Sequence, residues 1–239
     1  MPTTALIVAA GAGLRMGLGT PKAFLSIAGR SLMELSLAAF DSHPGIDGII
    51  LIAPADRLEE ARRIAAGFRK VKDVVAGGPR RQDSVRLGLE SLRGMIDDGR
   101  AGDPLVLVHD AARPLVDASL IAAVIDSTAR VGAAIPGLAP SDMVRQTSNG
   151  GGPPGHTRAG SVLDRRSLVL VQTPQGFRLP LLLDAYASAA DEEVTDDAAL
   201  VQRLGHPVEV VPGSPFNMKI TTPGDLEIAA AILAARNGS

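Results

Sequence analysis

The chain contains no cysteine and no tryptophan, and aromatic residues make up only 3% of its 239 residues. The lack of cysteine excludes disulfide bonds, thiolate metal sites and cysteine catalysis. The formal net charge is −2. Because the chain has no basic surplus and few side chains that could stack on bases, we do not expect nucleic acid to be its main partner.

No apolar run is long enough to cross a bilayer. The chain begins directly with a strand-like run, without the basic and apolar segments of a secretory leader. We therefore expect no membrane association and a cytoplasmic location. With 46% hydrophobic residues, the length suits a single α/β domain over residues 1–239.

Short apolar runs alternate with helical patterns, which indicates βα units and a mostly parallel sheet with helices on both faces. The runs are rich in Val, Ile and Leu without alternation, as strands covered on both faces are. The expected strands are Leu6–Ala9, Gly48–Ala53, Val71–Val75, Leu105–His109, Ala133–Leu138, Leu168–Gln172 and Val208–Val211.

Capping residues mark the expected helix starts. They are a Ser31–Glu34 capping box, a cap at Asp56, a start at Asp83 or Ser84, and Thr222 followed by Pro223 and Asp225.

Residues 140–166 break this rhythm. Their centre, 149–155, is rich in Gly and Pro and can be neither helix nor central strand. Because the flanking residues are modestly strand-like, we predict a projecting hairpin, a β-arm. A lone two-stranded ribbon is marginal in water, so we expect the arm to pack on a partner chain in a homodimer.

The first strand runs into a glycine-rich basic loop with Gly11, Gly13, Arg15 and Lys22. Glycine lets backbone N–H groups approach an anion, which the two cations can neutralise. The loop fits neither common nucleotide motif. The third glycine of a dinucleotide loop is displaced, with Met16 in its place, and the Gly-Lys-Ser/Thr of a Walker loop is absent.

A second strand ends in Asp110, and Arg113 follows. Ligands of open α/β sheets bind at the carboxyl ends of strands, and one carboxylate there suits Mg²⁺ held jointly with substrate phosphates. The alternative is that Asp110 caps the turn and pairs with Arg113. His109 is expected to be a hydrogen-bonded structural residue.

Three weaker patterns follow. Gly77, Gly78 and Ser84 form a glycine turn before a helix and could hold a base or ribose. Asp196 and Asp197 are typical acids of a helix start. Lys219 is an isolated cation in an apolar segment, where a phosphate partner would offset its burial.

Together these segments supply one well-placed acid and several cations, with no Ser–His–Asp arrangement and no apparent base. This set suits nucleotidyl transfer, in which a phosphate oxygen attacks the α-phosphate of a nucleoside triphosphate. A phosphate monoester is largely dianionic at neutral pH because its second pKa is about 6. Catalysis then reduces to alignment and charge stabilisation.

With these motifs, the chain resembles the 2-C-methyl-D-erythritol 4-phosphate cytidylyltransferase family over essentially its whole length. The matching motifs are residues 9–16 with Pro21 and Lys22, residues 109–114, residues 173–175, Thr195–Asp196, and Lys219. The resemblance implies a Rossmann-like, GT-A-like nucleotidyltransferase fold, a dimerising β-arm, and transfer of CMP from CTP to 2-C-methyl-D-erythritol 4-phosphate with Mg²⁺.

The resemblance also implies roles for individual residues. CTP would be held by Ala9, Ala10, Gly11, Gly78, Ser84, Asp110 and Ala111. Phosphates would be contacted in catalysis by Arg15, Lys22 and Lys219, and Asp110 would bind the metal. The acceptor would be framed by Arg113, Arg165, Thr173 and Thr195, with Arg165 supplied by a partner's arm.

The sequence departs from the family pattern in two places. Ser141–Asp142 stands where relatives have Asp-Thr, so either Ser141 takes the role of the Thr or phosphate binding is altered. Pro79 replaces an acid that many relatives place beside the cytosine, which matters little if that contact is through the backbone.

Three other functions stay open. A ribitol-5-phosphate cytidylyltransferase would have the same fold, but that group more often has Val before Arg113. An NAD-linked oxidoreductase is disfavoured by the displaced glycine and the missing ribose-binding acid. A catalytically inactive binding module is disfavoured by the intact set of cations.

Overall fold

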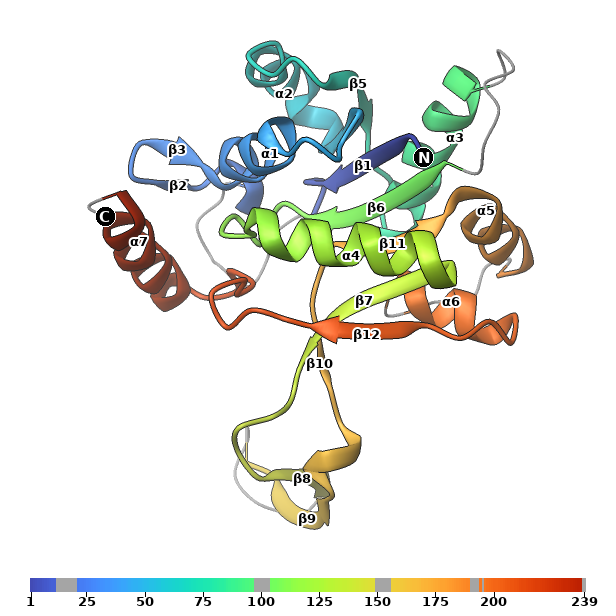
Figure 1. Cartoon of the computed structure of the whole chain (residues 1–239). Coiled ribbons are helices and arrows are strands. Elements are labelled where there is room, and N and C mark those ends of the chain that lie inside the picture. The colour runs from blue at the N-terminus through green and yellow to red at the C-terminus, as the bar shows by residue number, and fades with distance from the viewer. Residues whose placement is uncertain (12–20, 97–103, 149–155, 190–193, 195, 238–239) are drawn as a thin grey trace.

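The expected strands form one mixed sheet in the computed structural model, which describes residues 1–11, 21–96, 104–148, 156–189, 194 and 196–237 (Figure 1). The strands are β1 Thr3–Val8, β4 Gly48–Ala53, β5 Val71–Ala76, β6 Leu105–Asp110, β7 Ala133–Leu138, β10 Leu170–Val171, β11 Gln175–Arg178 and β12 Glu209–Pro212. Their order is β10-β7-β11-β6-β1-β4-β5, and β12 pairs with β7. The neighbours β6-β1-β4-β5 are parallel, so the predicted mostly parallel sheet is confirmed.

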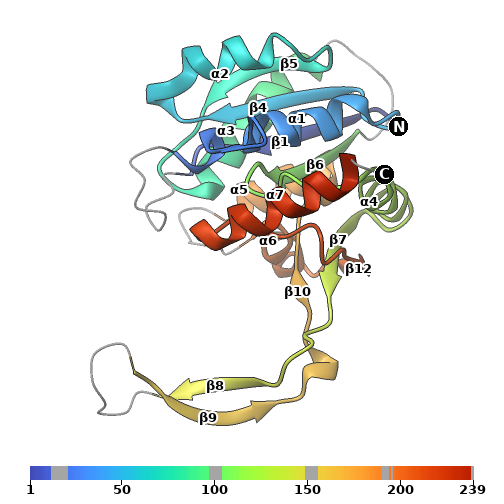
Figure 2. The same ribbon diagram turned by 90° about the vertical axis from the view of Figure 1, so that its left-hand side faces the viewer.

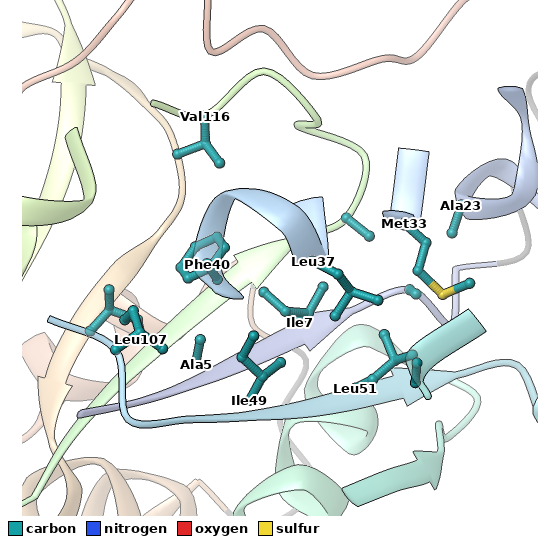
Figure 3. Packing of buried hydrophobic residues seen from close by; sticks show 14 of the residues in the cluster. Ala5, Ile7, Ala23, Met33, Leu37, Phe40, Ile49, Leu51, Leu107 and Val116 are labelled. Carbon is teal, nitrogen blue, oxygen red and sulfur yellow. The ribbon is translucent and has the colours of Figure 1, made fainter. Parts of the chain in front are cut away.

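Helices cover both faces of this sheet. They are α1 Leu32–Ser42, α2 Leu58–Ala65, α3 Arg81–Ile96, α4 Ala118–Val131, α5 Leu179–Ser188, α6 Asp197–Arg203 and α7 Pro223–Asn237. One core packs α1, α2 and α4 against Ala5, Ile7 and Leu107 (Figure 3), and the other packs α3, α5 and α6 against Leu6 and Val108. Successive strand residues point to opposite faces and both faces are buried, which explains the runs without alternation.

The remaining short elements lie around this frame. A small sheet pairs β2 Ser26–Ile27 with β3 Arg30–Ser31, and Ile27 shares a core cluster with Ala229 of α7 and with Ile220 of the segment before α7. The 3₁₀ turns are η2 Lys22–Phe24, η3 Ala55–Arg57 and η4 Arg165–Ser167. None of the helices described is both long and apolar enough to span a bilayer.

The capping predictions meet different outcomes. The Ser31–Glu34 capping box is present, and the Asp225 carboxylate accepts hydrogen bonds from the backbone of Thr221 and Thr222. The Asp56 cap is wrong, because residues 55–57 form a 3₁₀ turn and α2 follows without a side-chain cap.

The predicted start of α3 is also displaced. The helix begins at Arg81, and the Asp83 side chain reaches back to accept from the backbone N–H of Arg80. Asp83 thus binds a free backbone N–H at the start of the helix although it lies within the first turn. For this reason the acid did not show at which residue the helix begins.

The strand β11, which lies antiparallel between β6 and β7, was not predicted. Its core position is occupied by Gly176, where a Cβ would lie 2.1 Å from Oγ1 of Thr128. Close contact between β11 and α4 therefore requires glycine at this position. Glycine is uncommon inside strands, so the sequence pattern did not indicate a strand here. The predicted strand 168–172 is shorter than expected and is confined to β10.

The predicted hairpin is confirmed. Strands β8 Val144–Ser148 and β9 Arg158–Leu163 pair in antiparallel fashion and stand away from the sheet (Figures 1 and 2). At the base of the arm, Nη1 of Arg165 donates to the carbonyl of Ser141 (2.6 Å). The tip, 149–155, lies outside the described residues.

Candidate functional site

The pairing register of the central strands brings two loops to one edge of the sheet. Val8, the last residue of β1, lies opposite Asp110, the last residue of β6. Strands β4 and β5 lie on one side of β1 and β6 on the other. The chain thus changes direction beside β1, and the crevice at the strands' carboxyl ends is where open α/β sheets bind ligands.

A cavity of about 560 Å³ opens at this edge. It is lined by residues from the ends of β1 and β6, the start of α3, the η2 turn and the segment before α7. They are Val8, Ala9, Ala10, Gly11, Lys22, Ala23, Gly78, Pro79, Arg80, Arg81, Ser84, Asp110, Ala112 and Lys219. The structure thus brings together most residues expected to hold a nucleotide.

Asp110 is held by two cations at this edge. Arg81 Nε donates to its Oδ1 (3.0 Å), and Lys219 Nζ donates to its Oδ2 (2.7 Å). Burial acts to raise the pKa of the Asp110 carboxyl, but Arg81 and Lys219 outweigh burial and hold that pKa below its usual range. Asp110 is therefore a carboxylate throughout the physiological range.

The ion pair with Arg81 was not foreseen. In the sequence Arg81 follows a glycine turn and shows no partner, yet it opens α3 and faces the cavity. Burial disfavours its charge, but Asp197 and Asp110 outweigh burial and raise the pKa of the Arg81 guanidinium. The sequence does hold one indication of these partners. A helix dipole favours acids, not cations, at the helix start, so an arginine at that position needs acidic partners from other segments.

On the side of the cavity away from β6, the loop after β1 and the loop after β5 lie in close contact. A Cβ on Gly77 would lie 2.2 Å from the Cβ of Ala10, so the loop after β5 can approach the loop after β1 only through glycine. Ser84 Oγ accepts from the backbone N–H of Gly78 (3.1 Å). Ser84 therefore fixes the turn as well as lining the cavity.

Lys219 is carried by a segment without regular structure, which is anchored on both sides. Ile220 donates its N–H to the carbonyl of Ala112 (2.8 Å). Buried Asn217 donates to the carbonyl of Thr173 (2.8 Å), and Arg113 Nη1 donates to the carbonyl of Asn217 (2.9 Å). These bonds place the ammonium of Lys219 beside Asp110.

His109 has a structural role, as its sequence context predicts. Its Nε2–H donates to the carbonyl of Arg113 (3.2 Å), and its Nδ1 accepts from the hydroxyl of Thr173 (3.1 Å). The same hydroxyl accepts from the backbone N–H of Asp110 (3.1 Å). Burial lowers the pKa of His109 to about 3, so the imidazole is neutral and both ring nitrogens are engaged.

The other expected site residues lie around the cavity or outside the described part of the chain. Ala111 is buried behind it, and Thr173 and Arg113 bind the backbone of neighbouring segments, with Arg113 Nη2 also donating to the carbonyl of Val171 (3.3 Å). Arg165 lies on the arm. Arg15 and Thr195 fall outside the described residues.

This arrangement can bind an anion and hold a divalent cation with it. Among the described residues that line the cavity, Asp110 is the carboxylate and Lys22, Arg80, Arg81 and Lys219 are the cations. No group of three potential metal ligands occurs among the residues the structure describes. A cation at Asp110 would therefore share its coordination with a bound phosphate, which is common for Mg²⁺.

Lowering the pH from 7 to 4 will destabilise the protein through His109. The unfolded chain takes up a proton near pH 6.5, whereas native His109 does so only near pH 3. Between these values the native state therefore loses up to about 1.4 kcal/mol of stability per pH unit. Urea unfolding of the wild type and of His109→Gln measures this. The variant should lose less stability on acidification, and equally steep losses would contradict the assignment.

Comparisons with known proteins identify the family of the chain. The sequence profile described as 2-C-methyl-D-erythritol 4-phosphate cytidylyltransferase (IspD) matches residues 3–235. The protein of that name from Syntrophotalea carbinolica is 40% identical over 238 residues, covering 98% of this chain and 97% of its own. A "Bifunctional enzyme IspD/IspF" from Solidesulfovibrio magneticus is 44% identical over 240 residues; this chain spans about half its length (56%).

A solved structure leads to the same family. The crystal structure of 2-C-methyl-D-erythritol 4-phosphate cytidylyltransferase from Thermus thermophilus superposes with a TM-score of 0.73 at 38% identity, covering 98% of this chain and 100% of that one. The profile match covers nearly the whole sequence, and the Syntrophotalea and Thermus relatives are covered to 97% and 100% of their own lengths. The chain belongs to the 2-C-methyl-D-erythritol 4-phosphate cytidylyltransferase family.

Proposed function

We propose that this protein transfers CMP from CTP to 2-C-methyl-D-erythritol 4-phosphate, giving 4-diphosphocytidyl-2-C-methyl-D-erythritol and pyrophosphate. The observation that supports this most is the meeting of Lys22, Lys219 and Asp110 at one cavity. These residues come from three distant parts of a chain that belongs to a cytidylyltransferase family. Their charges suit a triphosphate and its metal ion.

The reaction needs no protein base. An oxygen of the acceptor phosphate, largely dianionic near pH 7, attacks the α-phosphorus of CTP. A new P–O bond forms, the bond to the β-phosphate oxygen breaks, and pyrophosphate leaves with those electrons. His109 cannot assist, because it is buried and both its ring nitrogens are bonded. The protein contributes alignment and positive charge.

Lys22 and Lys219 line the cavity and would neutralise charge that develops on the phosphates. Arg15, which lies outside the described residues, would join them from the glycine-rich loop. Ala9, Ala10, Gly11, Gly78 and Ser84 would hold CTP, and among the described residues no atom lies within 4 Å of a Cβ placed on Gly11. The backbone there leaves room for a ligand.

The donor set fits Mg²⁺. Asp110 offers one carboxylate, and a bound triphosphate would complete the shell with its own oxygens. When bound, Mg²⁺ would neutralise charge on the phosphates of CTP. The two cations that hold Asp110 in the described structure keep its carboxylate oriented toward the cavity.

The acceptor would lie next to this site. Thr173 and Arg113 lie next to Asp110 and the Lys219 segment through their hydrogen bonds, and we propose that they frame the acceptor together with Thr195. Arg165 would come from the arm of a second copy. The arm exposes Met143 (68%) and Val162 (51%), and a ribbon of two strands is marginal in water, so we propose a homodimer built on the arm.

Replacing Lys22 with Ala should abolish turnover, with kcat falling by at least about 10²-fold, because a charge aimed at the reacting phosphates is lost. Pyrophosphate release measures kcat, and circular dichroism reports folding. The matched control is Lys72→Ala, since Lys72 is an exposed lysine on β5 outside the cavity lining. A folded Lys22→Ala enzyme with near-normal kcat would refute the role of Lys22.

The acceptor is tested by parallel assays with CTP, Mg²⁺ and either 2-C-methyl-D-erythritol 4-phosphate or ribitol 5-phosphate. We expect a higher kcat/KM with the methylerythritol phosphate. A preference for ribitol 5-phosphate would assign the sister activity, which the Ser141–Asp142 departure leaves open. NADH binding without CTP binding would reject both.

The dimer is tested by sedimentation equilibrium at micromolar concentration. We expect twice the chain mass for the wild type. A smaller mass is expected for Val162→Asp, because a charge replaces an exposed apolar side chain of the arm. A wild type of single-chain mass at all concentrations would contradict the proposal.

A further inference from the structure

A line of ion pairs and hydrogen bonds leads away from the cavity to the only tyrosine of the chain. Arg81 Nε donates to Asp110, and Arg81 Nη1 donates to Oδ2 of Asp197 (2.7 Å). The hydroxyl of Tyr186 donates to the other oxygen of Asp197 (2.6 Å). The line joins α5, α6, α3 and the end of β6.

Helix capping does not explain the position of Asp197. The preceding residue, Asp196, caps α6, since its Oδ1 accepts from the backbone N–H of Ala199 (2.9 Å). The Asp197 side chain is only 1% exposed, and a buried carboxylate is unfavourable unless it is paired. The partners of the Asp197 carboxylate are Arg81 and Tyr186, so any effect of Asp197 on the cavity is exerted through these two side chains.

Arg81 is shared between two carboxylates. Its planar guanidinium has a fixed fork of donors, and it places one nitrogen on Asp110 and another on Asp197. Each carboxylate therefore limits how the guanidinium can rotate toward the other. Without Asp197, the guanidinium would be free to turn fully toward Asp110 or into the cavity.

We propose that Asp197 and Tyr186 are positioning residues of the transfer reaction, which hold Arg81 so that Arg81 fixes the Asp110 carboxylate at the cavity. Neither residue is among those that line the cavity, so both act through Arg81. This inference rests on the proposed function, because the role of Asp110 is to meet the phosphates of CTP and their cation.

Two conservative variants test the proposal. Asp197→Asn should lower kcat about 10- to 100-fold and Tyr186→Phe about 3- to 10-fold, since small misplacements of reacting groups have effects of this size. The KM for CTP should change less than about threefold, because alignment matters most in the transition state. The double variant should be no slower than Asp197→Asn, since Tyr186 acts through Asp197.

The chain offers a matched control away from the cavity. Glu209 likewise accepts from a hydroxyl, that of Ser127, and from Arg130. Glu209→Gln and Ser127→Ala remove the same kinds of contact and should leave kcat unchanged. If these control variants lowered kcat as much as the test variants do, the loss of activity would reflect a general loss of folded structure. The proposal would then fail.

A second readout does not depend on activity. The chain has no tryptophan and a single tyrosine, so emission excited in the tyrosine absorption band, where phenylalanine does not absorb, comes from Tyr186. A carboxylate that accepts a hydrogen bond from the tyrosine hydroxyl quenches this emission, so Asp197→Asn should raise it and Glu209→Gln should not. If the wild type makes no product, the proposed function fails, whereas the emission still reports whether the line of contacts exists.

The proposal is overturned if kcat of both test variants stays within twofold of the wild type. It is also overturned if Tyr186→Phe lowers kcat by the same factor in the wild type and in Asp197→Asn. Unchanged tyrosine emission in Asp197→Asn would overturn it as well. Should Asp197→Asn fail to fold, Tyr186→Phe decides, and a kcat within twofold of the wild type then rejects the proposal.

Discussion

The site depends on the carboxylate of Asp110, which is held between Arg81 and Lys219 at the end of a buried strand. These ion pairs join the start of α3, the end of β6 and the segment before α7, which are far apart in the sequence. The Asp110 side chain is largely buried, whereas those of Arg81 and Lys219 are partly exposed, so losing either cation would leave the carboxylate under-compensated. The pairs therefore fix the geometry of the cavity, and a triphosphate with its cation would enter an existing pattern of charges.

Neutral contacts hold the same strand end from behind. His109, the residue before Asp110, is fully buried and bonded at both ring nitrogens. The Thr173 hydroxyl serves both His109 and the backbone of Asp110. The charged groups thus face the cavity, and an uncharged network supports them, which is the separation expected of a site that works by electrostatic alignment.

Much of this could be predicted from the sequence. Buried apolar runs indicate most of the strands, and the residue types of the glycine-rich loop, Asp110 and Lys219 suffice to predict one shared ligand site. The pairing of Arg81 with Asp110 and Asp197 could not be predicted, because it depends on how the fold brings the starts of α3 and α6 to the end of β6. The strand β11 was missed for a related reason: Gly176 is required by a contact with Thr128 on α4, which local pattern does not reveal.

The central claim is that one triphosphate site is formed by residues from these separate segments. A crystal structure of the protein with CTP and Mg²⁺ tests it most directly. We expect the triphosphate in the cavity, in contact with Lys22 and Lys219, with the cation on Asp110. A nucleotide bound elsewhere, or a triphosphate that contacts none of these three residues, would contradict the claim.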